Sequence, residues 1–267
     1  MAAAHALTVY DGRHMAESFI VDRLWPDPAF GVELDAAFSE FTLPPARDDR
    51  PIVATNMVTT IDGRAQLAGT AEGLSRRADR RLMRLYRAAY DAVGSGVGTL
   101  RAADFYSRLP DDLAQRRVAS GRPAQPLAVV IGGARPIPTD RRWFAGDQPR
   151  LLIVGRGARR PDLPAGTELL ESPTADPQPD WILQQLAARG VGSLLLEGGP
   201  TTNSTFLAAG DLDELYWTLG ARVLATEALQ MIAAVHGGSP FAEHPREARL
   251  ISVHRSDDEL FLRYRFE

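Results

Sequence analysis

An acidic residue follows a run of leucines in the segment LLLEGGPTT, residues 194–202. The leucines predict a buried strand, which would place Glu197 at its carboxyl end, where open parallel sheets bind their ligands. Gly198 and Gly199 permit a tight turn and a close approach to a ligand, and Pro200 is typical of the first turn of a helix. The free N–H groups of such a turn favour a pyrophosphate. The segment predicts a carboxylate beside an anion-binding turn, although a plain strand–helix turn with a solvated glutamate has the same pattern.

A second glycine turn, SGVGT at residues 95–99, ends another apolar run. Gly96 and Gly98 would let the backbone meet a phosphate, and Thr99 would add a hydroxyl group. A lone GxG is also typical of an ordinary tight turn. Two such turns at strand ends of one sheet favour a dinucleotide site, although the full GxGxxG fingerprint of a Rossmann domain is absent.

A third strand end, NMVTTIDG at residues 56–63, carries Asn56, Thr60 and Asp62. These side chains could face the same edge of the sheet as the two glycine turns. Taken alone, the segment is more typical of an Asp-Gly turn with solvated threonines.

The composition excludes several kinds of chemistry. The chain of 267 residues has no cysteine, which removes disulfides, thiolate nucleophiles and cysteine-ligated metals. It also has no lysine, since all 30 of its basic residues are arginine, so Schiff-base chemistry and the lysine-dependent phosphate loop are excluded. A formal net charge of −4 argues against a broad surface for nucleic acid or acidic membranes.

Histidine spacing and hydropathy give two further expectations. No two of the five histidines stand at i, i+2 or i, i+4, so a histidine metal site has no local support. No apolar run approaches 18 residues, and the N-terminus lacks a signal-peptide pattern. We expect a cytoplasmic protein without nucleic-acid or membrane partners.

Strands alternate with helices through most of the chain, which predicts an α/β fold with a mainly parallel sheet. Leu82, Leu85, Tyr86 and Ala89 form one buried helical stripe, and Ser75 is placed to cap that helix. The other expected strands lie at 50–57, 91–99 (ending in the glycine turn), 127–133, 150–155, 167–172, 193–197 and 213–219, followed by a terminal antiparallel hairpin. Two further helices are expected at 180–189, with Ile182, Leu183, Leu186 and Ala187 buried, and at 201–209. The stretch 107–125 predicts a polar surface excursion.

We divide the chain into an N-terminal extension, residues 1–49, packed on a main domain, residues 50–267. Phe30, Leu34, Phe38 and Phe41 of the extension would lie on one face of a short helix.

Three ordered motifs together resemble the reductase domain of riboflavin biosynthesis: TTIDG at 59–63, LYRAAYDAVGSGVGTLRAAD at 85–104 and LLLEGGPTTNSTFLAAGDLDEL at 194–215. The resemblance covers roughly residues 50–265 and includes the C-terminal half of the bacterial deaminase–reductase and the stand-alone archaeal and fungal reductases. It implies a dihydrofolate-reductase-like fold, NADPH as cofactor and a homodimer, to which the apolar DELYWTL strand and the hairpin could contribute a partner face. The zinc deaminase domain of the bifunctional members needs cysteines, so this chain cannot carry that activity by the same mechanism.

The resemblance also implies roles for individual residues. Glu197 would contact the substrate pyrimidine, Arg87 would hold the ribose phosphate, and Asp62 would orient the site. The substrate pocket would further include Asn56, Thr60 and Asp104. The cofactor would be bound by Val58 and Gly73 on the nicotinamide side, Gly96, Gly98, Thr99, Gly198, Gly199, Pro200 and Thr201 around the diphosphate, and Gly133 and Arg135 at the adenosine 2′-phosphate. The alternative for Arg87 is a solvated arginine on the surface of a helix, and the alternative for Arg135 is an ordinary loop arginine.

Three departures from the family pattern concern the pocket. Asn56 stands where many bifunctional members have lysine, Ala103-Asp104 replaces a double acid, and Gly220-Ala221-Arg222 replaces a proline motif.

The implied reaction is a hydride transfer from NADPH to C1′ of a ring-opened ribosylamino-pyrimidine 5′-phosphate. A dihydrofolate or pterin reductase on the same fold and a non-catalytic NADPH-binding module are the alternatives. An ordinary Rossmann dehydrogenase is disfavoured, because GxGxxG and a Tyr-x-x-x-Lys pair are missing.

Overall fold

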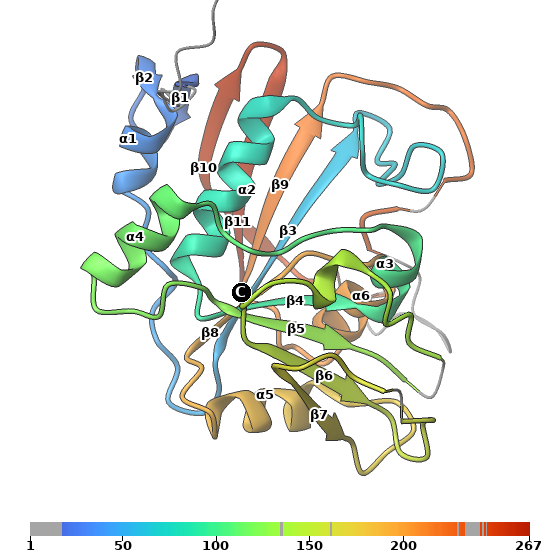
Figure 1. Cartoon of the computed structure of the whole chain (residues 1–267). Helices are drawn as coiled ribbons and strands as arrows, with labels where there is room; N and C mark the ends of the chain where they lie inside the picture. Colours follow the sequence, from blue (N-terminus) through green and yellow to red (C-terminus); the bar gives the residue numbers. More distant parts are fainter. Residues whose placement is uncertain are drawn as a thin grey trace, which may run out of the picture.

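The computed structural model describes residues 18–133, 136–160, 162–228, 230–232, 241, 243 and 245–267. Within these residues, eleven strands form one sheet in the order β2-β1-β10-β11-β9-β3-β8-β4-β5-β6-β7 (Figure 1). The strands are β1 (Ile20–Trp25), β2 (Ala29–Glu33), β3 (Ile52–Thr60), β4 (Ala92–Gly96), β5 (Leu127–Ile131), β6 (Arg150–Val154), β7 (Thr167–Glu171), β8 (Ser193–Leu196), β9 (Glu214–Gly220), β10 (Ala248–Ser256) and β11 (Glu259–Phe266).

The sheet has a parallel half and an antiparallel half. The strands from β9 through β3, β8, β4, β5 and β6 to β7 pair in parallel. The pairs β9–β11, β11–β10, β10–β1 and β1–β2 are antiparallel. The expected α/β class and terminal hairpin are confirmed. Because β9 lies between β3 and β11, its edge is not open to a partner strand.

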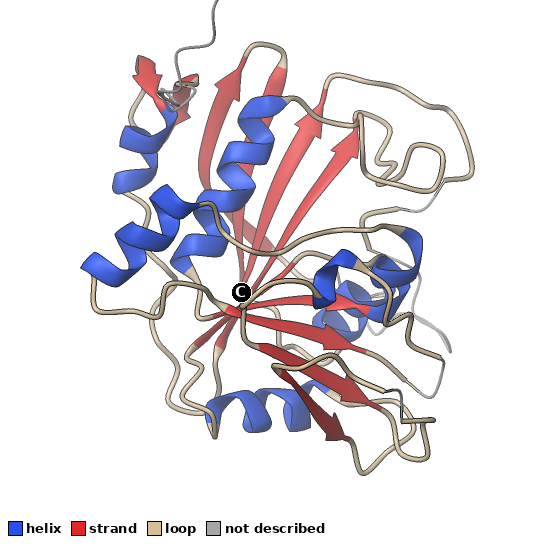
Figure 2. Ribbon diagram, in the orientation of Figure 1, coloured by secondary structure: helices blue, strands red, loops and turns tan. Residues whose placement is uncertain are grey.

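Helices cover both faces of the sheet (Figure 2). They are α1 (Leu34–Ser39), α2 (Arg77–Ala89), α3 (Val97–Ala102), α4 (Asp111–Ala119), α5 (Pro179–Ala187) and α6 (Pro200–Ala208), with a 3₁₀ turn η1 (Arg142–Phe144). Alternation along β8 sets the two faces: Leu195 packs with α1, α2 and α4, whereas Leu194 and Leu196 pack with α5 and α6. Glu197, one residue further, therefore falls on the α2 face.

The N-terminal extension joins the same sheet through β1, which pairs with β10. The predicted helix over Phe30 to Phe41 is wrong in its first half, because Phe30 lies in β2 and is 71% exposed. Leu34, Phe38 and Phe41 do pack against the core. Figure 1 shows α1, α2 and α4 side by side on this face.

Three smaller expectations are also corrected. Ser75 does not cap α2, which begins at Arg77 after Arg76 and has no side-chain cap. The stretch 107–125 contains α4, whose Leu113 is buried. Ala187, expected on the buried stripe of α5, is exposed.

Candidate active site

Glu197 and Arg87 form a paired carboxylate and guanidinium beneath α2. Arg87 donates from Nε to Oε1 of Glu197 at 2.6 Å and from Nη2 to Oε2 at 2.7 Å, and its Nη1 donates to the carbonyl of Tyr106 at 3.0 Å. The two side chains are only 7% and 9% exposed. Burial of both charges is tolerable because the geometry is bidentate. The sequence predicted both residues for the site, but with separate contacts to the pyrimidine and to the phosphate.

Strand register places Asn56 and Ser95 beside Glu197. Thr55 pairs with Leu196 in β3–β8, and Gly94 pairs with Leu196 in β4–β8. One position further along each strand, Asn56 and Ser95 flank Glu197 on the α2 face. The amide N–H of Glu197 donates to the carbonyl of Gly94 at 2.8 Å. This hydrogen bond keeps Glu197 in register with β4, level with Asn56 and Ser95.

The two glycine turns meet at the starts of α3 and α6. The amide of Gly96 donates to the carbonyl of Gly198 at 2.8 Å. A Cβ added at Gly96 would lie 2.4 Å from Oγ1 of Thr202, and one at Gly199 would lie 3.2 Å from Oγ1 of Thr99. The Gly198–Gly199 peptide is cis, and Gly198 has φ +92°. The absence of side chains at Gly96 and Gly199 therefore lets the two turns pack directly against Thr202 and Thr99.

The first turn of α6 has no side chain at its N-terminus to accept its N–H groups. Its N-cap is Gly199, which forms no cap hydrogen bond, and Pro200 occupies the first helical turn. Thr201 and Thr202 follow, and both lie in this turn. This is the arrangement that holds phosphate groups at helix N-termini.

Asp62 ties two loops together rather than facing Glu197. Its carboxylate accepts from the hydroxyl of Thr60 at 2.6 Å and from the amides of Leu224 and Ala225 at 3.2 and 2.8 Å. These hydrogen bonds, that of Thr60 first, lower the pKa of Asp62 to about 2. Asp62 is therefore ionised at neutral pH and holds the loop after β9 against the loop after β3.

Other predicted site residues are spread along the carboxyl edge of the sheet. Asn56 and Val58 lie in β3, where they pair with Tyr216 and Thr218 of β9. Gly73 lies in the loop after β3 with φ +82°. The carboxylate of Asp104 accepts a hydrogen bond from the backbone amide of Arg142 at 2.7 Å. In this structure Asp104 therefore binds the first residue of η1.

Of the two residues predicted to bind the adenosine 2′-phosphate, Gly133 and Arg135, the structure describes one. Gly133 follows β5, and a Cβ there would lie 3.2 Å from Oδ1 of Asp176. Arg135 lies outside the described residues. Gly98 is the second residue of α3, and a Cβ added there would have no atom within 4 Å.

Sequence reasoning missed Asp79, a buried carboxyl on α2. It accepts from the hydroxyls of Ser75 at 2.5 Å and Thr218 at 2.6 Å. Burial raises its pKa, against these hydrogen bonds, and the nearby charge of Glu197 adds a smaller contribution. In the sequence, Asp79 looks like one more acidic residue in the first turn of a helix.

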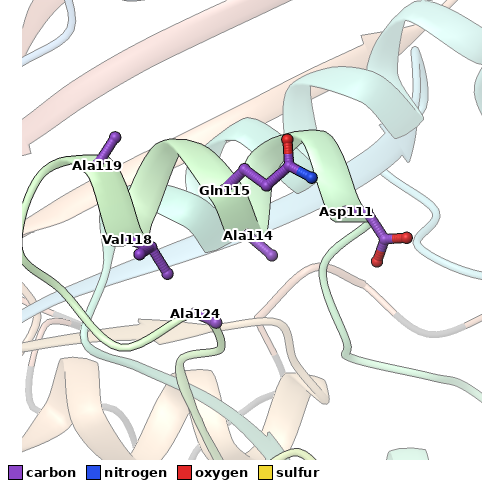
Figure 3. Close-up of a pocket in the computed structure, with 6 residues that line it drawn as sticks. All are labelled: Asp111, Ala114, Gln115, Val118, Ala119 and Ala124. Carbon is purple, nitrogen blue, oxygen red and sulfur yellow. The ribbon is translucent and has the colours of Figure 1, made fainter.

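A shallow hollow over α4 lies apart from these residues. It is lined by Asp111, Ala114, Gln115, Val118, Ala119 and Ala124 (Figure 3). It shares no residue with the predicted site.

Residues 51–228 match the RibD C-terminal domain family. The chain belongs to this family. The matched range contains Glu197, Arg87, both glycine turns and Asp62, so the resemblance inferred from three motifs is confirmed.

Two curated relatives show what similar proteins do. The chain is 28% identical over 169 residues to the 2,5-diamino-6-ribosylamino-4(3H)-pyrimidinone 5′-phosphate reductase of Methanothermobacter thermautotrophicus, covering 62% of this chain and 76% of the relative. It is 31% identical over 172 residues to the riboflavin biosynthesis protein RibD of Mycobacterium tuberculosis, covering 63% of this chain but 42% of that longer relative. These relatives support an oxidoreductase.

A solved structure confirms the fold. The pyrimidine reductase-like protein of Corynebacterium diphtheriae superposes with a TM-score of 0.70 at 20% identity, covering 82% of this chain and 93% of that chain.

Among the described helices, none is long and apolar enough to cross a bilayer. The described residues also contain no cluster of three or more acidic or histidine side chains that could bind a metal.

Proposed function

We propose that this protein reduces a ribosylamino-pyrimidine 5′-phosphate to its ribitylamino form, with NADPH as the hydride donor. The observation that carries the proposal is the buried Glu197–Arg87 pair at the end of β8, one residue from the glycine turns that meet at α3 and α6. The named activity of the archaeal relative supports this substrate class.

The glycine turns fit a dinucleotide. Added methyl groups at Gly96 and Gly199 would crowd Thr202 and Thr99, so glycine at these positions lets the two turns pack closely at the start of α6. The N–H groups of the first turn of α6 and the hydroxyls of Thr99 and Thr201 would hold its oxygens. When bound, the reduced nicotinamide would supply the hydride. Recognition of a 2′-phosphate would then fall to Arg135 and the loop after Gly133.

Glu197 would accept hydrogen bonds from the pyrimidine. A carboxylate has about four lone-pair sites, and Arg87 uses two of them, so two remain for donors on the ring. Arg87 fixes the orientation of the carboxylate. Its Nη1 and Nη2 each retain one N–H without a partner among the described residues, and these would face a phosphate or the ribose.

The reaction consumes one proton. Opening of the ribose ring breaks the C1′–O4′ bond, O4′ takes a proton, and the nitrogen lone pair forms the C1′=N bond to which the hydride adds. Asp62 is ionised at neutral pH, and Glu197 is held by Arg87, so neither is suited to donate this proton. We assign the proton to water and the positioning of the pyrimidine to Glu197.

The test is an assay of NADPH oxidation with three substrates side by side, in which the loss of nicotinamide absorbance is the readout. These are the 2,5-diamino-pyrimidinone ribosyl phosphate, its deaminated 5-amino-uracil counterpart, and dihydrofolate. Turnover of a ribosyl phosphate that is lost in Glu197→Gln supports the proposal and names the substrate. Turnover of dihydrofolate alone, or NADPH binding without any turnover, overturns it.

We further propose that the protein is a cytoplasmic homodimer, as expected from the family resemblance. Sedimentation velocity of the full chain at micromolar concentration gives one species of twice the chain mass of 29.1 kDa if this is correct. A species of the single-chain mass contradicts it.

A further inference from the structure

A cavity of about 220 Å³ lies between the N-terminal extension and the α2 face of the sheet. Its walls include the aromatic rings of Phe38 from α1, Phe41 from the loop just after it, Tyr86 from α2 and Phe261 from β11. An engineered apolar cavity of roughly 150 Å³ takes up benzene. The space here is larger and, unlike that cavity, partly open to solvent, and with rings on several sides it has room for one aromatic ring or two fused rings.

The aromatic walls are held in fixed positions by other rings. Phe38 stacks on Phe41 at 4.7 Å between centroids, and Tyr86 stacks on Tyr216 at 4.3 Å. The guanidinium of Arg263 covers Phe41 at 4.6 Å, and Arg263 is itself bound to Glu214. The cavity is therefore bordered by packed rings that lack freedom to collapse into it.

His254 of β10 is a polar residue on the cavity wall, which also carries Ser252 of the same strand and the charged groups of Arg23, Glu40 and Arg263. It pairs with Arg23 of β1 and Phe261 of β11 in the sheet, and its imidazole lines the cavity. No residue that the structure describes forms a hydrogen bond with this imidazole. Burial, followed by the charge of Arg23, lowers its pKa, so at neutral pH one ring nitrogen is free to accept a hydrogen bond.

The charged groups at the rim are already paired with each other. Arg23 donates to Glu40 and to the carbonyl of Asp27, and the side chain of Glu40 is 66% exposed. A charged ligand would have to break this pair, whereas a neutral ligand would not.

We propose that this cavity binds a small neutral aromatic molecule of one or two fused rings, which donates a hydrogen bond to His254. The site is distinct from the candidate active site. Of the described residues that line it, only Leu82 and Tyr86 lie within the family match at 51–228. The inference therefore does not depend on the proposed function.

The test is calorimetric titration of the full chain with indole and with 1-methylindole. The two probes have the same fused ring, but only indole carries an N–H donor. We expect saturable binding of both, with indole about fivefold tighter, the factor that one net hydrogen bond contributes. Absence of saturable binding of indole overturns the proposal.

Three variants locate the binding. Ala37→Trp fills the cavity from α1 and abolishes binding of both probes, whereas Ala187→Trp, on an exposed position of α5 on the opposite face, leaves both unchanged. His254→Phe keeps a ring but removes the acceptor, so it weakens indole about fivefold and leaves 1-methylindole unchanged. If Ala37→Trp does not fold, the His254→Phe comparison decides alone. Unchanged indole affinity in His254→Phe contradicts the assignment.

Discussion

The guanidinium of Arg87 holds both carboxylate oxygens of Glu197, although the two residues are 110 positions apart in the chain. The pair joins α2 to the end of β8 across the face on which Asn56 and Ser95 lie. This one salt bridge therefore positions the carboxylate that we propose binds the substrate pyrimidine, and it also anchors α2 to β8.

Removal of one partner should destabilise the fold. Arg87→Ala leaves the Glu197 carboxylate buried without its counter-charge, and we expect a loss of about 3 kcal/mol in the free energy of unfolding, measured by urea denaturation. Arg84→Ala, an exposed arginine one turn away on α2, is the matched control and should change stability by less than about 0.5 kcal/mol. The double variant Arg87→Ala/Glu197→Gln should recover part of the loss, and equal stability of the double and single variants would contradict this account.

The glycine turns give a second prediction that does not depend on activity. A methyl group at Gly96 would lie 2.4 Å from Oγ1 of Thr202, so Gly96→Ala should destabilise the protein by about 1–3 kcal/mol. Thr202→Ala in the same chain removes the clash and should restore most of the stability. Gly98→Ala, two residues further and with nothing within 4 Å of its added Cβ, serves as the control. Failure of Thr202→Ala to rescue would show that crowding by Oγ1 is not the cause.

Much of the fold was predictable because its signals are local. The stripe of α2, the apolar strands of the parallel half and the terminal hairpin each have a period that one short window reveals. The extension was harder, because β1 is stabilised by β10, more than 200 residues later. Its phenylalanines happen to have helical spacing, yet Phe30 belongs to a strand.

The site was predictable in its placement but not in its contacts. Glu197 and the glycine turns follow from strand ends and turn chemistry, which the sequence displays directly. The bond from Arg87 to Glu197 depends on the packing of α2 over β8, and the burial of Asp79 depends on Thr218 of β9. No local pattern distinguishes Asp79 from a solvated acidic residue at the start of a helix.

Asp62 should stabilise the protein only above strongly acidic pH. Hydrogen bonds lower its folded pKa to about 2 from 3.8, so its contribution is fully present above the unfolded pKa and is lost as pH falls through the folded one. Asp62→Ala should therefore be less stable than wild type at pH 5, and the difference should shrink between pH 4 and pH 2. Thermal unfolding across this range measures it. A difference that stays constant would mean that the carboxylate charge does not matter.

Asp79 should have the opposite pH dependence. Burial raises its folded pKa above 3.8, so between the unfolded and folded values the native state binds more protons, and stability falls as pH rises through that window. Glu259, whose pKa is also raised by burial and by Asp79, adds to the same trend.

Asp79→Asn is the variant that isolates this effect. It removes the titrating group but keeps an oxygen for one of the hydroxyls of Ser75 and Thr218. Denaturation of wild type and variant from pH 4 to pH 8 should show wild type losing stability relative to the variant as pH rises. Arg80, Glu197 and Glu259, the other charged groups near Asp79, are present in both proteins. If the two pH profiles stay parallel, Asp79 is already ionised at pH 4, and the paired hydroxyl donors outweigh the cost of burying its charge.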